Sequence, residues 1–289
     1  MTQIPRSPHS SDEFQRRLTE RQQREQSFYK LQSSFEQAKN IDLDNDANWN
    51  EWNPDHHVCQ LAERRHVGAH QRVLDIGCGA GTMSVRLARM GYNVEGIDIC
   101  DNNILLARTL ADRYDVTGRC RFRKMVAEHL DYPDGHFDMV VGMNILAHVE
   151  VPDAASEVWR VLKLGGAAVF KESVHVPVVD HLRNTSIAQS ILPHRDEQPR
   201  DHRQINGEDV QIIESLFDHV ESRRFTVFSR FDRLIPGRGK AMRRALERVD
   251  QTLLRACPPL AHLGGTAVIA GYKWTDPGAD QATQYRIAA

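Results

Sequence analysis

The stretch Val73-Leu74-Asp75-Ile76-Gly77-Cys78-Gly79-Ala80-Gly81 decides the fold of this 289-residue chain. Its apolar start predicts a strand over 72–77, and the amphipathic run that follows predicts a helix over 82–91. Three alternating glycines stand between them and let the backbone turn sharply and approach a ligand closely. A strand, a glycine loop and the electropositive start of a helix together indicate a nucleotide-type binding site.

Two acidic residues and the spacing of the glycines indicate which class of ligand the site binds. A dinucleotide site has glycine or alanine three residues after the second glycine, where this chain has Thr82. Asp75, two residues before the first glycine, would repel a pyrophosphate and suits a ligand with an amine and no phosphate. Asp98 closes the next predicted strand, about 20 residues downstream, where an acid accepts ribose hydroxyls. An amine and a ribose without phosphate describe S-adenosylmethionine.

Strands and helices alternate from residue 71 onward, which is typical of βαβ units. The predicted strands are 72–77, 93–98, 120–127, 137–143, 167–173, 223–231 and 266–274. The predicted helices between and around them are 82–91, 103–114, 151–162, 207–216 and 240–257, preceded by 12–39 and 54–65. We therefore expect an α/β fold with a Rossmann-like, seven-stranded, mostly parallel sheet and helices on both faces.

Five segments resemble the core of class I S-adenosylmethionine-dependent methyltransferases, in particular the ubiquinone/menaquinone-type small-molecule enzymes. They are VLDIGCGAG (73–81), GID (96–98), AEHL (127–130), FDMVVGMNILAHV (137–149) and VLKLGG (161–166), in the family's order and spacing. The resemblance covers residues 72–173. It implies S-adenosylmethionine as cofactor and a small-molecule methyl acceptor. It also divides the chain into an N-terminal tail and helical arm or lid (1–66), a methyltransferase core (67–275) with substrate-cap insertions (174–222 and 235–262), and a tail (276–289).

The resemblance also implies the cofactor-binding residues. By position in the family's motifs they are Asp75, Gly77, Gly79, Gly81, Asp98, Ile99, Ala127, Glu128 and Asn144. Asp75 is expected to support the glycine loop and the methionine amine, and Asp98 to bind the ribose. Val126 stands where the family usually has an acid beside adenine, so Glu128 or the backbone is expected to make that contact. Asn144 ends the fourth strand, at the methionine end of the cofactor and next to the substrate.

Methyl transfer from a sulfonium requires the protein to align acceptor, methyl group and sulfur and to exclude water. A hydroxyl or carbon acceptor also needs a base, whereas a neutral amine does not. His148, just past the fourth strand, is our first candidate base, because open α/β sheets bind ligands at that edge. The alternative is a residue that only packs the loop. His175, after the fifth strand, is the second candidate. We expect transfer to a hydroxyl oxygen, with carbon or nitrogen as the alternative.

Two tryptophans precede the core. Trp49 and Trp52 are predicted to close over cofactor or substrate, and the alternative is that they dock the N-terminal helix. No metal site is expected, because the histidines of the predicted insertion form no HxH, HExxH or i,i+4 pair.

Composition limits the class of partner. The 37 Lys and Arg nearly balance the 39 Asp and Glu, which argues against a generally basic nucleic-acid binder. One stretch, 223–248, carries nine basic against two acidic residues. Its interpretations are a solvated surface, an anionic substrate, an acidic lipid surface or RNA, with nucleic acid disfavoured. Five scattered cysteines without a CxxC pair predict no disulfide framework and a cytoplasmic location. No apolar run reaches membrane-spanning length, and a homodimer is left open.

Overall fold

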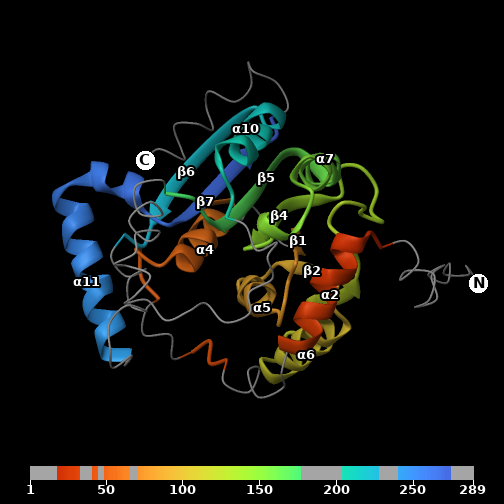
Figure 1. Ribbon diagram of the computed structural model, residues 1–289. Helices are drawn as coiled ribbons and strands as arrows, with labels where there is room; N and C mark the ends of the chain where they lie inside the picture. Colours follow the sequence, from red (N-terminus) through yellow and green to blue (C-terminus); the bar gives the residue numbers. More distant parts are fainter. Residues whose placement is uncertain are drawn as a thin grey trace, which may run out of the picture.

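The computed structural model describes residues 18–32, 41–44, 49–65, 71–176, 204–227 and 240–274 (Figure 1). The helices are α2 (Glu20–Gln32), α4 (Pro54–Arg65), α5 (Thr82–Arg89), α6 (Asp101–Arg113), α7 (Val151–Val161), α10 (Gly207–Leu216) and α11 (Lys240–Ala256), with 3-10 turns η1 (Leu146–His148) and η3 (Pro258–Leu263). The strands are β1 (Arg72–Ile76), β2 (Asn93–Asp98), β3 (Cys120–Lys124), β4 (Phe137–Met143), β5 (Leu162–Ser173), β6 (His219–Phe225) and β7 (Thr266–Tyr272). No helix within these ranges is both long and apolar enough to cross a bilayer.

The seven strands form one sheet in the order β3-β2-β1-β4-β5-β7-β6. The first five are parallel, and β7 runs antiparallel to both of its neighbours. The prediction of a seven-stranded, mostly parallel α/β sheet is confirmed. Because parallel strands end at the same edge, the loops after β1 to β5 meet there.

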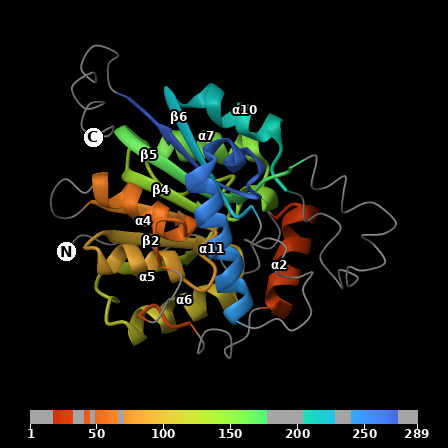
Figure 2. The same cartoon turned by 90° about the vertical axis from the view of Figure 1, so that its left-hand side faces the viewer.

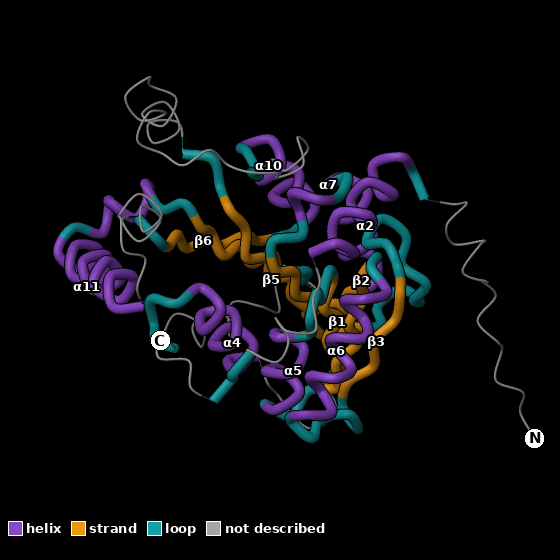
Figure 3. The backbone as a smooth tube through the Cα atoms, turned by 60° about the horizontal axis from the view of Figure 1, so that its bottom comes forward, coloured by secondary structure: helices purple, strands orange, loops and turns teal. Residues whose placement is uncertain are grey.

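Helices cover both faces of the sheet (Figures 2 and 3). Successive residues of a strand point to opposite faces, so Val73 belongs to the core under α4, α5 and α6, and Leu74 to the core under α7 and α10. The amphipathic α5 buries one stripe, and α7 buries another, including Val158 and Val161. Both cores are apolar, and this fixes the register of the strands whose ends carry the site.

Two strands, β5 and β6, begin earlier than predicted, and four strands, β1, β3, β6 and β7, end earlier. β5 begins at Leu162 instead of residue 167, and it pairs with β4 across a register irregularity between Phe137 and Met139. β6 begins at His219 instead of residue 223. It is an edge strand with mostly half-exposed side chains, so its sequence needs no alternation of apolar and polar residues. The apolar pattern therefore predicted a start four residues too late.

The second half of the segment predicted as a substrate cap, 174–222, is not an insertion over the sheet. Residues 207–216 form α10, which packs against α7, and β6 follows directly in the sheet. This half is therefore part of the layered core. The segment 177–203, most of the remaining predicted cap, lies outside the described residues, as do the tails 1–17 and 275–289.

The N-terminal arm reaches the edge of the sheet where the parallel strands end. Its helix was predicted over 12–39, and the structure describes it as α2. This helix contacts α6 (Figure 1), and its Gln26 donates to the carbonyl of Ile99, the residue after β2. It thereby stands over the edge at which the loops after the parallel strands converge.

Candidate active site at the carboxyl edge of the sheet

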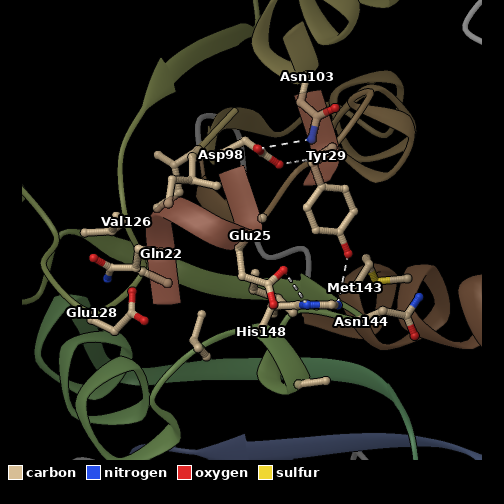
Figure 4. Close-up of a pocket in the computed structure, with 18 of the residues that line it drawn as sticks. Gln22, Glu25, Tyr29, Asp98, Asn103, Val126, Glu128, Met143, Asn144 and His148 are labelled. Atoms are coloured by element: carbon tan, nitrogen blue, oxygen red, sulfur yellow. Dashed lines mark hydrogen bonds and ion pairs between the residues drawn. The ribbon is translucent and has the colours of Figure 1, made fainter. Parts of the chain in front are cut away.

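A cavity of about 480 Å³ lies between α2 and the ends of the parallel strands (Figure 4). Helix α2 contributes Gln22, Glu25 and Tyr29. The strand ends, the loops and the 3-10 turn after them and the start of α6 contribute Gly77, Gly79, Ile97, Asp98, Ile99, Asn103, Met125, Val126, Ala127, Glu128, Met143, Asn144, Ile145, Ala147, His148, Val149, Glu172, Ser173 and Gln204. The cavity thus brings together most of the residues that the sequence assigns to cofactor and catalysis.

The glycine loop has a backbone conformation that glycine adopts easily and residues with a Cβ rarely adopt. Gly77, Gly79 and Gly81 all have positive φ, at 63°, 53° and 82°. A Cβ built on Gly77 would lie 2.5 Å from Cδ1 of Ile145, whereas a Cβ on Gly79 would meet no atom within 4 Å. The loop therefore packs closely at its first glycine and leaves open space at its second, where it lines the cavity.

Asp98 is fixed between this loop and α6. Its Oδ2 accepts the Gly79 N–H at 3.0 Å, and its Oδ1 accepts the Cys100 N–H at 2.8 Å and the Asn103 amide at 3.1 Å. Burial raises the pKa of Asp98, and the Cys100 hydrogen bond opposes that shift. A carboxylate has about four acceptor positions, so these three bonds leave about one for a ligand hydroxyl.

Asp75 lies behind the loop and does not line the cavity. It is fully buried, and its Oδ2 accepts the Ser84 hydroxyl of α5 at 2.5 Å. Burial raises its pKa to about 7, against the Ser84 hydrogen bonds, which lower it. Its Oδ1 has no hydrogen-bond partner among the described residues. The structure thus places Asp75 where it supports the loop and the start of α5, and its predicted contact with the methionine amine remains a prediction.

The charge of the lining suits a cation. Four carboxylates line the cavity, from Glu25, Asp98, Glu128 and Glu172, and the described lining contains no lysine or arginine. Such a lining attracts a sulfonium and an amine and repels a phosphate. Together with the open space at Gly79 and the spare acceptor of Asp98, it fits S-adenosylmethionine. No three His, Cys, Asp or Glu side chains gather as metal ligands in the described part of the chain.

His148 stands in the cavity wall with both ring nitrogens engaged (Figure 4). Its Nδ1 lies 3.0 Å from Oε2 of Glu25, and its Nε2 lies 3.0 Å from the hydroxyl of Tyr29. The side chains of His148 and Glu25 are only 8% and 6% exposed. Glu172 fixes the turn that carries the histidine, because its Oε1 accepts the N–H groups of Ile145 and Leu146 at 2.8 and 2.9 Å.

Besides Asp75 and Gly81, three predicted site residues lie outside the cavity lining. His175 is exposed, and its backbone pairs with Ile205. Trp49 has the Arg86 guanidinium 3.7 Å from its ring centre, on α5. Trp52 lies between two arginines, Arg223 of β6 and Arg255 of α11, at 5.4 and 5.5 Å. Both tryptophans thus contact arginines of other elements. Closure over cofactor or substrate, and the alternative of docking the N-terminal helix, both remain predictions.

Sequence reasoning missed the contribution of α2. Gln22, Glu25 and Tyr29 line the cavity, whereas the helix was predicted from its sparse apolar residues alone. A signal was present: residues 18, 22, 25 and 29 follow helical spacing, so one face combines a leucine with a carboxylate and a phenol. Polar residues on such a face are usually solvated, and only the fold shows that this face meets His148.

Comparisons with known proteins place the chain in a family. A family model described as "Methyltransferase domain" matches residues 74–170. Methyltransferase GfsG from Streptomyces halstedii is 31% identical over 194 residues, which are 63% of this chain and 68% of that protein. The ubiquinone biosynthesis O-methyltransferase of Roseobacter denitrificans is 37% identical over 99 residues, and its match spans only 34% of this chain and 39% of that protein.

Solved structures share the fold. The [4+2]-cyclase SpnF aligns with a TM-score of 0.57 and 22% identity over 89% of this chain and 97% of its own. Geranyl diphosphate C-methyltransferase from Streptomyces coelicolor A3(2) aligns with a TM-score of 0.54 and 14% identity over 89% and 99%.

The glycine loop, Asp98 at the end of β2 and the acid-lined cavity, together with these matches, define a class I S-adenosylmethionine-dependent methyltransferase. The chain belongs to the methyltransferase family whose domain covers residues 74–170, and the predicted family, enzyme class and cofactor are confirmed. One of the two structural neighbours is called a cyclase, so the fold by itself does not define a reaction.

Proposed function

We propose that this protein transfers the methyl group of S-adenosylmethionine to a hydroxyl oxygen of a small molecule, with His148 as the base. The observation that carries the proposal is the position of His148 Nε2 in the cavity wall, 3.0 Å from a hydroxyl oxygen, that of Tyr29. This distance lies within the range for proton transfer from an acceptor hydroxyl held at the same nitrogen.

The chain's residues have separate tasks in this reaction. Bound S-adenosylmethionine supplies an activated methyl group. The glycine loop and Asp98 orient the cofactor, and α2 with the turn η1 encloses the site and excludes water. The acceptor hydroxyl takes the place of the Tyr29 hydroxyl at Nε2 of His148, which accepts its proton. The acceptor oxygen forms its bond to the methyl carbon as the carbon–sulfur bond breaks, and the sulfur leaves as a neutral thioether. The proton then rests on the imidazole ring.

Several observations support a small, uncharged acceptor. Cofactor and acceptor share a cavity of about 480 Å³ whose described lining carries no basic group for an anionic reacting end. The match to an enzyme named for O-methylation in ubiquinone biosynthesis favours oxygen over carbon or nitrogen. A cytoplasmic location and a homodimer remain predictions.

The basic stretch 223–248 also favours a small molecule over RNA or an acidic lipid. Arg223 packs over the rings of Trp52 and Phe225, and Arg224 donates to the carbonyl of His262. These two arginines therefore make internal contacts. Arg248 is exposed on α11, and residues 228–239 lie outside the described chain.

The first experiment separates cofactor binding from chemistry. Calorimetry with S-adenosylmethionine should show binding by the wild type and strongly weakened binding by Asp98→Ala. Incubation of metabolite extracts with methyl-deuterated S-adenosylmethionine, followed by mass spectrometry, then identifies the acceptor and the methylated atom. A wild type that labels nitrogen or carbon, but no oxygen, would overturn the choice of a hydroxyl.

The second experiment tests the base. His148→Ala should lower kcat by roughly 100-fold or more, while its affinity for S-adenosylmethionine changes by only a few-fold. His129→Ala is the matched control, because His129 is exposed and lies outside the cavity lining. His175→Ala tests the second candidate, for which we expect the smaller loss. Unchanged turnover in His148→Ala would leave alignment alone as the mechanism.

A further inference from the structure

The histidine of the site is held by a residue from a distant part of the chain. Glu25 lies 123 residues before His148 and is 5% exposed. Within α2 it is the one fully buried residue among those whose side chains are described, which are residues 20–30. Burying a carboxylate costs free energy unless a partner compensates, and the described hydrogen bond of Glu25 goes to the imidazole of His148.

The hydrogen bonds around His148 define its tautomer. An ionised carboxylate only accepts hydrogen bonds, so the nitrogen that faces Glu25, Nδ1, carries the proton. In a neutral imidazole the other nitrogen, Nε2, then has the lone pair. Tyr29 donates its O–H to that lone pair: burial, followed by the charge of Glu25, raises the pKa of Tyr29 and keeps the phenol protonated.

We propose that Glu25 is a positioning residue that fixes His148 as the Nδ1–H tautomer, so that α2 completes the base of the site. This inference rests on the proposed function of His148. During transfer, the acceptor hydroxyl replaces Tyr29 at Nε2, its proton moves to Nε2, and the ring becomes an imidazolium. The carboxylate of Glu25 stabilises that cation across the Nδ1–H bond and does not take the proton itself.

Polar contacts with two loops and with the start of α6 hold helix α2 in place. Arg21 donates to the carbonyl of Val149 at 2.9 Å and pairs with Glu150, both after η1. Gln26 donates to the carbonyl of Ile99 at 3.0 Å, after β2, and the Asn102 amide donates to the carbonyl of Lys30 at 3.2 Å. With so little apolar burial in the helix, these bonds determine where Glu25 lies. The base is therefore complete only while α2 occupies this position.

The first test measures the tautomer directly and needs no substrate. Long-range ¹H–¹⁵N spectra of ¹⁵N-histidine-labelled protein show which ring nitrogen is protonated, and the His148 signals are those lost in His148→Gln. We expect the Nδ1–H tautomer in the wild type and a mixture in Glu25→Gln, whose amide donates as well as accepts. Glu20→Gln, an exposed carboxylate on the same helix, should match the wild type. A wild-type spectrum with the Nε2–H tautomer would overturn the proposal, whatever the variants do.

The second test uses turnover with the acceptor found by isotope labelling. Glu25→Gln should lower kcat by roughly 100-fold or more, with the acceptor KM within about threefold of wild type. Glu25→Asp keeps the charge and should recover part of kcat. A Glu25→Gln variant with wild-type kcat would refute the positioning role. Failure of the wild type to methylate any hydroxyl would refute the proposed function, while the spectra would still report whether Glu25 sets the tautomer.

Discussion

At the scale of single residues, Gly77 and Gly79 share a positive φ but meet different surroundings. Gly77→Ala adds a Cβ 2.5 Å from Ile145, whereas Gly79→Ala points into the open space of the cavity. Both should lose about 1–2 kcal/mol of stability from backbone strain, and Gly77→Ala about 1–3 kcal/mol more from overpacking. Gly79→Ala should instead lose more affinity for S-adenosylmethionine than its loss of stability explains.

Urea unfolding and calorimetry measure the two effects separately. Gly118→Ala is the control, because that glycine has no positive φ and open space around it. Equal stability losses in Gly77→Ala and Gly79→Ala would show that the Ile145 contact is unimportant.

Asp75 should make the stability of the fold depend on pH. Its pKa is about 7 in the folded protein against 3.8 in the unfolded chain, because burial disfavours the carboxylate. Between these values the folded state holds a proton that the unfolded state lacks, so stability falls as pH rises from about 4 to 7 and is then constant. Asp75→Asn cannot ionise and should escape that loss, which is on the order of 4 kcal/mol at most.

The measurement is the difference in unfolding free energy between Asp75→Asn and wild type at pH 4.5 and at pH 8. We expect the variant to gain on the wild type at the higher pH. A difference that does not change with pH would show that Asp75 ionises normally inside the protein.

At the scale of elements, the turn η1 depends on one buried carboxylate. Glu172 of β5 is 1% exposed and accepts the N–H groups of Ile145 and Leu146. Glu172→Ala should leave both donors unpaired, cost about 1–3 kcal/mol and displace His148. Glu172→Gln keeps an acceptor oxygen and should lose less.

Thermal unfolding and kcat test this pair of variants. Both Tm and kcat should fall in Glu172→Ala, because the same turn supports the stability of the fold and carries the histidine. A Glu172→Ala variant that keeps wild-type stability would show that Glu172 does not stabilise the turn η1.

The elements also show what the sequence could predict. The strands β1 to β4 and the glycine loop follow local patterns, and Asp98 is located by its spacing from the loop, so each was predictable. The start of β6 was not, because an edge strand tolerates polar residues on both faces. Glu25 was not predictable either, because a glutamate among Gln and Arg is usually solvated. Its role depends on a contact 123 residues away that no local pattern records.

At the scale of the whole molecule, cofactor binding should stabilise the fold. A ligand at 100 times its Kd contributes about 2.7 kcal/mol, which corresponds to a rise in Tm of about 4 to 5 °C for a chain of this size. S-adenosylmethionine should give that rise with the wild type. Asp98→Asn should show little of it, because the amide cannot accept the same set of hydrogen bonds.

Differential scanning fluorimetry provides the measurement. Asp112→Asn, an exposed acid on α6 outside the cavity lining, is the control and should shift like the wild type. An equal shift in Asp98→Asn would place the cofactor elsewhere.

The residues of the site come from two separate segments of the chain. The matched family domain, residues 74–170, contains the glycine loop, Asp98 and His148, whereas Glu25 and Tyr29 lie upstream of it. We therefore expect that exchanging the N-terminal segment alters the acceptor chemistry while the cofactor half stays unchanged. Chimeras that graft foreign arms onto this sheet offer a route to altered regiochemistry.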